Sequence, residues 1–218
     1  KSLDRIEQTM NAIRDDNLAH RTVRIHIPPS LLQQQFLPIL KDFRAEYPDI
    51  RVDVSSSNVT GLPATALDMA IVYDRPNVDD QVTDLLWMVR VAPLCSPETA
   101  KMAQGRSLGE FLSQQDLLHI KLEDQPRDLL WSAFARQMGM KVNTADGIAF
   151  DTAITAAHYA MTANGVLLGD VDMFADEIAQ GRLQMPYEAV VEDGYGYYLK
   201  LHADDLSDPA MAVFRSWL

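Results

Sequence analysis

The feature that most constrains the fold lies at residues 23–43, where a strand pattern passes into a helix pattern across two prolines. Apolar and polar residues alternate over residues 23–27, which is the two-residue period of a strand with one buried face. Pro28 and Pro29 end the strand because neither can donate a backbone hydrogen bond to a ladder. Apolar residues then recur every three or four positions, which predicts a helix that starts near Ser30.

Ser30 suits the N-cap of this helix, because its hydroxyl oxygen can accept a hydrogen bond from an N–H group of the first turn. A helix that starts where a strand ends presents unpaired N–H groups and the positive end of its dipole, which can bind an anion or a carboxylate. An ordinary strand-to-helix connection with a structural cap explains the same residues, and both interpretations stay open here. Pro38, inside the helix, predicts a bend.

The next elements continue in the same order. Pro48 ends the helix, residues 50–54 alternate again as a second strand, and residues 68–73 form the continuous apolar run of a strand buried on both faces. Strand, helix and strand in this order predict a parallel α/β sheet, and ligands bind beyond the carboxyl ends of such strands. Those ends are residues 29–30, 57–58 and 73–74.

Residues 95–190 repeat the α/β pattern and predict a second lobe. Strands are expected at residues 86–95, 117–122, 147–150, 166–168 and 183–185. Helices are expected at residues 128–138, 152–163 and 171–180. Ser107 and Glu110 form a capping box at the start of a further short helix. A strand at residues 195–202 and an amphipathic helix at residues 209–218 follow.

Residues 1–20 differ from the rest of the chain. Leu3, Ile6, Met10 and Ile13 form an a/d seam of about two heptads, which is too short to stand alone as a coiled coil. The segment is either a terminal helix that lies on the domain or the end of a longer dimerising helix.

Composition excludes several classes of protein. The net charge of −12 argues against this stretch binding nucleic acid, whose phosphates require clustered Lys and Arg. No apolar run approaches the ~20 residues that span a bilayer, and no secretory leader stands at the start, so no membrane partner is expected. The lone Cys95 rules out an internal disulfide and favours a reducing compartment, the cytoplasm.

No catalytic constellation emerges from the sequence. The five histidines never share the spacing of a metal pair, and a single cysteine excludes thiolate clusters. The sequence contains no serine-nucleophile motif, phosphate-binding loop or dinucleotide fingerprint. We therefore expect no metal, no cofactor and no enzyme activity, and favour a binding protein.

Several motifs follow one another in a specific order and spacing. They are PSLLQQQFLPILKDFRAEYPDIRVDV, ALDMAIVYDRP, VRVAPLCSPE, FDTAITAAHYAMTANGVLLGDVDMFADEIAQGRLQMP and the closing FRSWL. Together they resemble the effector-binding domain of LysR-type transcriptional regulators over residues 21–218. The wording FDTAITAAHYAMTANGVLLG with MFADEIAQGRL is similar to the branch that contains glycine-cleavage and β-lactamase regulators.

The resemblance implies two Rossmann-like lobes of the type II periplasmic-binding-protein kind, joined by two crossing strands. Lobe I would comprise residues 21–92 plus 200–218, and lobe II residues 93–199. Residues 1–20 would be the end of the family's linker helix, which dimerises, and this favours the second interpretation of the seam.

The resemblance also implies a small effector between the lobes. The contact positions carried over to this chain are Pro29, Ser30, Leu31, Ser57, Asn58, Phe150, Asp151, Thr152 and Tyr197. Ser30 and Thr152 would bring two hydroxyls and two positive dipole ends to one carboxylate. Asp74 and Asp151 would hold an ammonium group, which makes an amino acid or a peptide-like acid the expected ligand.

The function implied is that of an effector-sensing domain of a transcription regulator. Such a protein is a homodimer or homotetramer and binds DNA through an N-terminal winged helix-turn-helix that is absent from these residues. The alternative with the same fold is a stand-alone solute-binding protein of a transport system. A leader peptide would support the alternative, whereas a DNA-binding domain in the same protein would exclude it.

Overall fold

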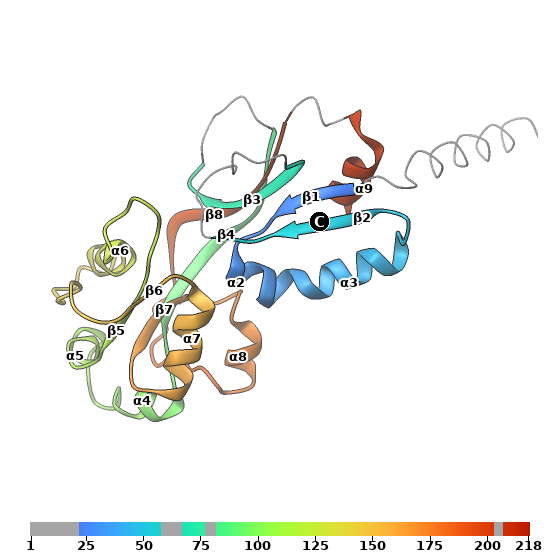
Figure 1. Cartoon of the computed structure of the whole chain (residues 1–218). Helices are drawn as coiled ribbons and strands as arrows, with labels where there is room; N and C mark the ends of the chain where they lie inside the picture. The colour runs from blue at the N-terminus through green and yellow to red at the C-terminus, as the bar shows by residue number, and fades with distance from the viewer. Residues whose placement is uncertain (1–21, 58–66, 77–81, 203–206) are drawn as a thin grey trace, which may run out of the picture.

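The computed structural model describes residues 22–57, 67–76, 82–202 and 207–218 (Figure 1). The strands are β1 (Thr22–His26), β2 (Arg51–Ser55), β3 (Met69–Asp74), β4 (Val82–Cys95), β5 (Leu117–Ile120), β6 (Ala149–Phe150), β7 (Val166–Asp170) and β8 (Val191–Leu201). The helices are α2 (Pro29–Leu31), the π-helical turn η1 (Leu32–Phe36), α3 (Leu37–Glu46), α4 (Pro97–Lys101), α5 (Leu108–Leu112), α6 (Leu129–Gln137), α7 (Ala153–Thr162), α8 (Ala175–Ala179) and α9 (Pro209–Trp217). The predicted linker helix at residues 1–20 lies outside the described residues.

All the described strands belong to one eight-stranded mixed sheet in the order β2-β1-β3-β8-β4-β7-β5-β6. Strands β1, β2 and β3 are parallel at one end, and β7, β5 and β6 are parallel at the other. We call these two groups, with the helices that connect them, the first half and the second half. The α/β class predicted from the sequence is confirmed, while the residue limits of the two lobes stay a prediction.

The long strands β4 and β8 join the two halves. They pair antiparallel along most of their length, and β8 also pairs with β3 while β4 pairs with β7. Two register shifts interrupt the β4–β8 ladder within residues 85–90. Irregularities of this kind bend a strand and re-aim its side chains. Figure 1 shows β4 running from one half of the molecule into the other.

The predicted strand before the two prolines is confirmed as β1, but the helix after it begins earlier than expected. Pro28 is the N-cap residue and makes no side-chain capping bond, and Pro29 is the first helical residue. Proline suits that position because N–H groups of the first turn have no acceptor within the helix, so a residue without an N–H loses no hydrogen bond there. The prediction that Ser30 caps its own helix is therefore wrong, and its hydroxyl is left to bind elsewhere.

The bend predicted at Pro38 takes the form of a π-helical turn directly before it. Pro38 lies in the first turn of α3 and cannot donate to the carbonyl four residues back. The Leu37 N–H instead donates to the Leu32 carbonyl five residues back, which is the π-helical pattern. The sequence thus forces a wider turn in the helix beside the strand ends.

Two predictions in the second half are wrong. The helix expected at residues 171–180 covers only α8, because residues 171–174 form a turn in which the Asp170 side chain accepts the Asp172 N–H. The strand expected at residues 183–185 is an isolated bridge between Gln184 and Cys95. The capping box of α5 is confirmed, with both of its reciprocal hydrogen bonds present.

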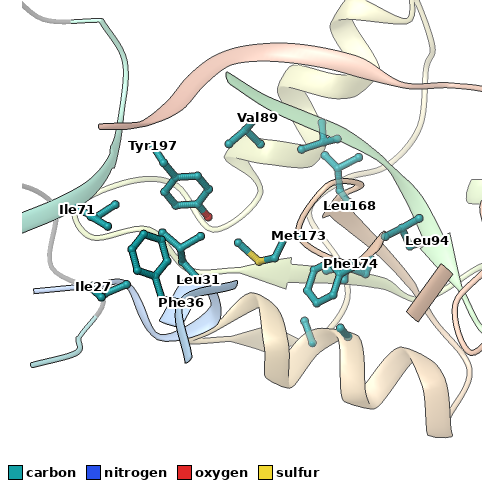
Figure 2. Close-up of a cluster of buried hydrophobic side chains, with 14 of the residues drawn as sticks. Ile27, Leu31, Phe36, Ile71, Val89, Leu94, Leu168, Met173, Phe174 and Tyr197 are labelled. Carbon is teal, nitrogen blue, oxygen red and sulfur yellow. The ribbon is translucent and has the colours of Figure 1, made fainter. Parts of the chain in front are cut away.

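The apolar core passes continuously from one half to the other. Leu31 and Phe36 of the first half belong to the same buried cluster as Met173 and Phe174 of the second half. Figure 2 shows these side chains together, with the Tyr197 ring among them and its hydroxyl directed into the cluster. The two halves are therefore packed against each other.

An aromatic cluster fixes α3 to the C-terminal helix α9. The Phe43 ring is fully buried, and its centroid lies 4.8 Å from that of Phe214 and 5.9 Å from that of Trp217. Tyr47 stacks on Phe43 at 5.1 Å. Aromatic pairs at these separations add to the free energy already gained by burial.

We expect Phe43→Ala to lower the free energy of unfolding by about 3–5 kcal/mol, because it leaves a cavity at the centre of this cluster. Urea denaturation followed by circular dichroism measures the change. Leu37→Ala is the matched control, since Leu37 belongs to the same helix but is 53% exposed. Equal losses in the two variants would contradict the assignment of the cluster to the core.

Candidate functional site

A cavity of about 110 Å³ lies where the carboxyl ends of strands from both halves meet. Six of the predicted site residues line it: Pro29, Ser30, Ser57, Asp151, Thr152 and Tyr197. Apolar side chains such as Val89, Leu168 and Met173 complete much of the wall. Apolar cavities of about 150 Å³ hold a molecule the size of benzene, so this cavity suits a small ligand.

Of the other four predicted residues, the three that the structure describes do not line this cavity. Leu31 is buried in the apolar core, and the Phe150 ring packs on Tyr159 with centroids 5.4 Å apart. The Asp74 carboxylate lies 3.7 Å from the Lys200 ammonium group. Asn58 lies outside the described residues. The role of all four in ligand binding stays a prediction.

The N-terminus of α7 faces the cavity, and side chains from both halves cap it. Thr152 is its N-cap, and its Oγ1 accepts a hydrogen bond from the Thr155 N–H at 3.2 Å. Ser30 comes from the first half, and its Oγ accepts a hydrogen bond from the Ile154 N–H at 3.0 Å. No side-chain acceptor for the Ala153 N–H exists among the described residues. Ser30 thus joins the two halves at the cavity wall.

Two glutamines of η1 add polar contacts between the halves. The Gln34 Nε2 donates to Glu177 Oε2 at 3.0 Å. The Gln35 Nε2 donates to the Asp172 carbonyl at 3.2 Å and to the Met173 carbonyl at 3.4 Å. Together with the Ser30 bond, these contacts join the two halves beside the cavity.

One ion pair stands at the cavity wall. The Lys121 Nζ lies 2.5 Å from Asp151 Oδ1, and both side chains are more than half exposed. Solvent screens an exposed pair of this kind, so its contribution to stability is small. The pair nevertheless gives Asp151, one of the two carboxylates predicted to bind an ammonium group, a cation of its own.

His26 holds the loop after β2 against the cavity. Its Nδ1 lies 3.0 Å from the Ser55 hydroxyl, and its Nε2 lies 3.3 Å from the Ser57 carbonyl oxygen. Burial lowers the pKa of His26, although the contact with the Ser57 carbonyl acts in the opposite sense. The imidazole is therefore neutral at pH 7 and positions Ser57 at the cavity wall.

Aromatic rings from β3 and β8 form another wall, and the Trp87 ring of β4 packs beside them. Tyr73 stacks on Tyr195 with centroids 4.8 Å apart, and its hydroxyl donates to Asp193 Oδ2 at 3.2 Å. The Tyr197 ring lies 5.5 Å from Tyr73 and 5.1 Å from Trp87. Burial raises the pKa of both Tyr73 and Tyr197, so these phenols stay neutral at physiological pH.

Asp170 and Lys121 are the charged cavity residues that sequence reasoning missed. The strand predicted at residues 166–168 continues as β7 to Asp170, whose side chain lines the cavity. Burial raises the pKa of Asp170 to about 6, whereas backbone hydrogen bonds from Asp172 and Met173 act in the opposite sense. A charged residue at the carboxyl end of a buried parallel strand was the available signal, because ligands bind at that position.

Two polar atoms beside this wall are buried without a hydrogen-bond partner in the described part of the chain. They are Asp170 Oδ2 and Trp87 Nε1. The indole N–H lies near enough to the carboxyl to favour its charged form, yet no hydrogen bond between them is completed. Buried polar atoms are almost always paired in folded proteins, so this pair is unusual.

The described residues were also considered as metal ligands, as membrane-spanning helices and as reactive thiols. Among the described residues, no three His, Cys, Asp or Glu side chains converge as a metal site. No helix in the described ranges combines the length and the apolar character that crossing a membrane requires. Cys95 is buried, and burial raises its pKa to about 12, so the thiol stays protonated and unreactive at neutral pH.

We expect Ser30→Ala to lower the free energy of unfolding by about 0.5–2 kcal/mol, the usual loss for a helix cap. The Ile154 N–H loses its acceptor in this variant. Chemical denaturation of the two proteins checks the difference. Ser132→Ala, whose hydroxyl contacts only the Leu129 carbonyl of its own helix, serves as the control. Identical stability of Ser30→Ala and the wild type would contradict the role of Ser30 as a cap of α7.

The pH dependence of the stability of Asp170→Asn tests the raised pKa of the buried Asp170 carboxyl group. A folded-state pKa of about 6, raised from 3.8, means that the folded protein holds a proton which the unfolded chain has lost between those values. The contribution of Asp170 to stability therefore falls as pH rises from about 4 to 6 and is absent from Asp170→Asn. Between pH 5.0 and 7.5 the variant should gain about 1 kcal/mol relative to the wild type in urea denaturation. A constant difference would contradict the raised pKa.

Comparison with known proteins gives a consistent assignment. The family model described as the LysR substrate binding domain matches residues 16–218. The glycine cleavage system transcriptional activator of Escherichia coli (strain K12) is 28% identical over 203 residues, which cover 92% of this chain and 65% of that protein. The HTH-type transcriptional activator AmpR of Rhodobacter capsulatus is 30% identical over 183 residues, which cover 84% of this chain and 60% of that protein.

Solved structures agree with the fold. The effector domain of the transcriptional regulator AmpR of Pseudomonas aeruginosa has a TM-score of 0.76 and 26% identity, with 90% of this chain and 92% of that chain covered. The AmpR effector binding domain from Citrobacter freundii also has a TM-score of 0.76, at 23% identity, with 91% of this chain and 96% of that chain covered. These neighbours confirm the predicted fold of the type II periplasmic-binding-protein kind.

The chain spans 65% of the length of the glycine cleavage activator that it matches. The relatives are transcriptional regulators and not enzymes, and the alternative of a transport binding protein is not favoured. The match over residues 16–218 and the shared fold lead to one conclusion: the chain belongs to the LysR substrate-binding domain family and is the effector-binding domain of a LysR-type regulator.

Proposed function

We propose that this domain binds a small carboxylate or amino-acid-like effector in the cavity between its two lobes. The proposal takes lobe I as residues 21–92 plus 200–218 and lobe II as residues 93–199. The observation that carries it is the cavity at the start of α7, where the Ser30 hydroxyl of the first half and the Thr152 hydroxyl of the second half meet the backbone N–H groups of α7. Such a set of donors at the positive end of a helix dipole favours a negatively charged group.

The Ser30 hydroxyl at the cavity can still donate a hydrogen bond to a ligand. Ser30 Oγ accepts from Ile154, and in the described part of the chain its own proton has no acceptor. The Ser30 hydroxyl can therefore donate a hydrogen bond to a ligand carboxylate. The Ala153 N–H at the start of α7 can donate another. Two or three charge-assisted hydrogen bonds of this kind are enough to orient a small acid.

Effector binding changes the balance between lobe arrangements. The contacts from Ser30, Gln34 and Gln35 cross between the halves, so a ligand that competes with or reinforces them shifts the population of closed molecules. A ligand shifts this balance only by the difference between its affinities for the two arrangements. Polar contacts that exist only in the closed form supply such a difference.

The output of the switch lies in a longer protein. We infer an N-terminal winged helix-turn-helix that binds DNA, joined to this domain through a dimerising helix at residues 1–20, in a cytoplasmic homodimer or homotetramer. Relatives with HTH-type names and greater length support this inference. The acidic charge of this chain, −12, agrees with DNA contacts made by another part of the protein.

A thermal-shift screen against amino acids and small carboxylates tests the proposal. A ligand present at ~100 times its dissociation constant adds about 2.7 kcal/mol, which raises the melting temperature by about 5–11 °C in a domain of this size. Ser30→Ala and Thr152→Ala should weaken binding, because one hydrogen bond to a charged group contributes about 1.5–3 kcal/mol.

Ser132→Ala, away from the cavity, is the control and should keep the full shift. If both cleft variants bind the ligand as tightly as the wild type, the site lies elsewhere. If no small molecule shifts the melting temperature and the domain stays monomeric at high concentration, the sensor proposal is wrong.

A further inference from the structure

We propose that Asp170 binds an ammonium group of the effector, so that the effector is a small amino acid or a similar zwitterion and not a simple carboxylate. The inference rests on the proposed function and deepens it. It assigns the positive end of the ligand to the carboxyl end of β7, opposite in charge to the helix N-terminus that takes the carboxylate.

The first support is the state of the Asp170 carboxylate. The residue lines the cavity and is only 7% exposed. Its Oδ1 accepts the Asp172 N–H at 3.0 Å, whereas its Oδ2 is buried with no hydrogen bond in the described part of the chain. A buried carboxylate oxygen without a donor is costly, and a ligand that brings a donor removes that cost.

The second support is the absence of a protein cation for this carboxylate among the described residues. Arg90 is the nearest candidate, but its guanidinium forms a two-point pair with Asp172, with distances of 2.9 and 2.6 Å. Lys121, on the cavity wall, is 2.5 Å from Asp151. Asp170 therefore has no ion pair of its own among the described residues, and only the more distant charge of Arg90, which is already paired with Asp172, acts on it.

The third support is the chemistry around the carboxylate. The negative charge of Asp170 contributes to the raised pKa of Tyr197, and both residues line the same cavity. In the described part of the chain the Tyr197 hydroxyl has no hydrogen-bond partner. An ammonium group has three N–H donors, which suits one carboxylate oxygen, one phenol oxygen and a further acceptor.

Protonation agrees with this assignment. Burial raises the pKa of Asp170 to about 6, so the group is still mainly ionised at neutral pH and can attract a cation. The backbone N–H groups of Asp172 and Met173 and the Trp87 indole favour its charged form, whereas the Asp172 carboxylate disfavours it. The Arg90 guanidinium also interacts electrostatically with Asp170. A bound ammonium group would remove the remaining penalty by supplying the opposite charge.

The two acidic residues predicted from the sequence for this role have cations already. Asp151 pairs with Lys121, and Asp74 lies 3.7 Å from Lys200 and outside the cavity lining. Asp170 combines burial, a place in the wall and an unpaired oxygen, which neither of them does. The cavity volume of about 110 Å³ further favours small side chains on the ligand.

Isothermal titration calorimetry with matched ligand pairs tests the inference. Glycine and both enantiomers of alanine, serine and threonine are compared with the acids that lack the amino group, such as acetate for glycine and propionate for alanine. At least one amino acid should bind ten or more times tighter than its partner acid. Asp170→Asn should reduce that ratio to about one. Asp176→Asn, an exposed change of the same kind on α8, should leave it unchanged.

The possible failures point to different errors. If acids without an amino group bind as tightly as amino acids, or if Asp170→Asn keeps the discrimination, the assignment of Asp170 is wrong and the effector proposal stands. If no amino acid binds, the assignment is also overturned, and the effector proposal falls only if carboxylates fail to bind as well. A second variant, Asp170→Ser, excludes an effect of the introduced amide, and circular dichroism verifies that both variants fold.

Discussion

The antiparallel pairing of β4 with β8 is the constraint on which the rest of the molecule depends. It makes one sheet out of two parallel groups, each of which has its strands' carboxyl ends toward the middle. Residues after β1, β2 and β5 and at the end of β7 therefore meet around one cavity. In open α/β sheets this is the edge at which ligands bind. The register shifts within residues 85–90 lie on the strand that contributes Val89 and Val91 to the wall.

Some polar groups at this edge make hydrogen bonds between the two halves, whereas others have no hydrogen-bond partner among the described residues. Ser30, Gln34 and Gln35 make hydrogen bonds between the halves, each of the kind that contributes about 0.5–1.5 kcal/mol. Asp170 Oδ2 and Trp87 Nε1 make none within the described residues, and an unsatisfied buried group costs about 1–3 kcal/mol. These opposing amounts are similar in size. A ligand that supplies the missing partner would therefore gain an amount comparable with one of the hydrogen bonds between the halves.

Local rules account for most elements of the fold. Alternation, proline positions and capping residues predict β1, the end of α3, the capping box of α5 and the N-cap of α7, and the structure agrees. These features depend on neighbours within one turn or one strand. The failures occurred where a distant contact decides the outcome. Ser30 has the chemistry of a cap, but it caps a helix 124 residues away because the sheet brings α7 opposite.

The sequence by itself determined the α/β class, the order of the elements and six of the residues that line the cavity, because periodicity, turn chemistry and family motifs are properties of short stretches. Only the tertiary structure decided how the charges are paired. Asp151 received Lys121 and Asp172 received Arg90, whereas Asp170 Oδ2 was left buried without a donor in the described part of the chain. Pairing and burial depend on distances between residues far apart in the chain, and no local pattern encodes them.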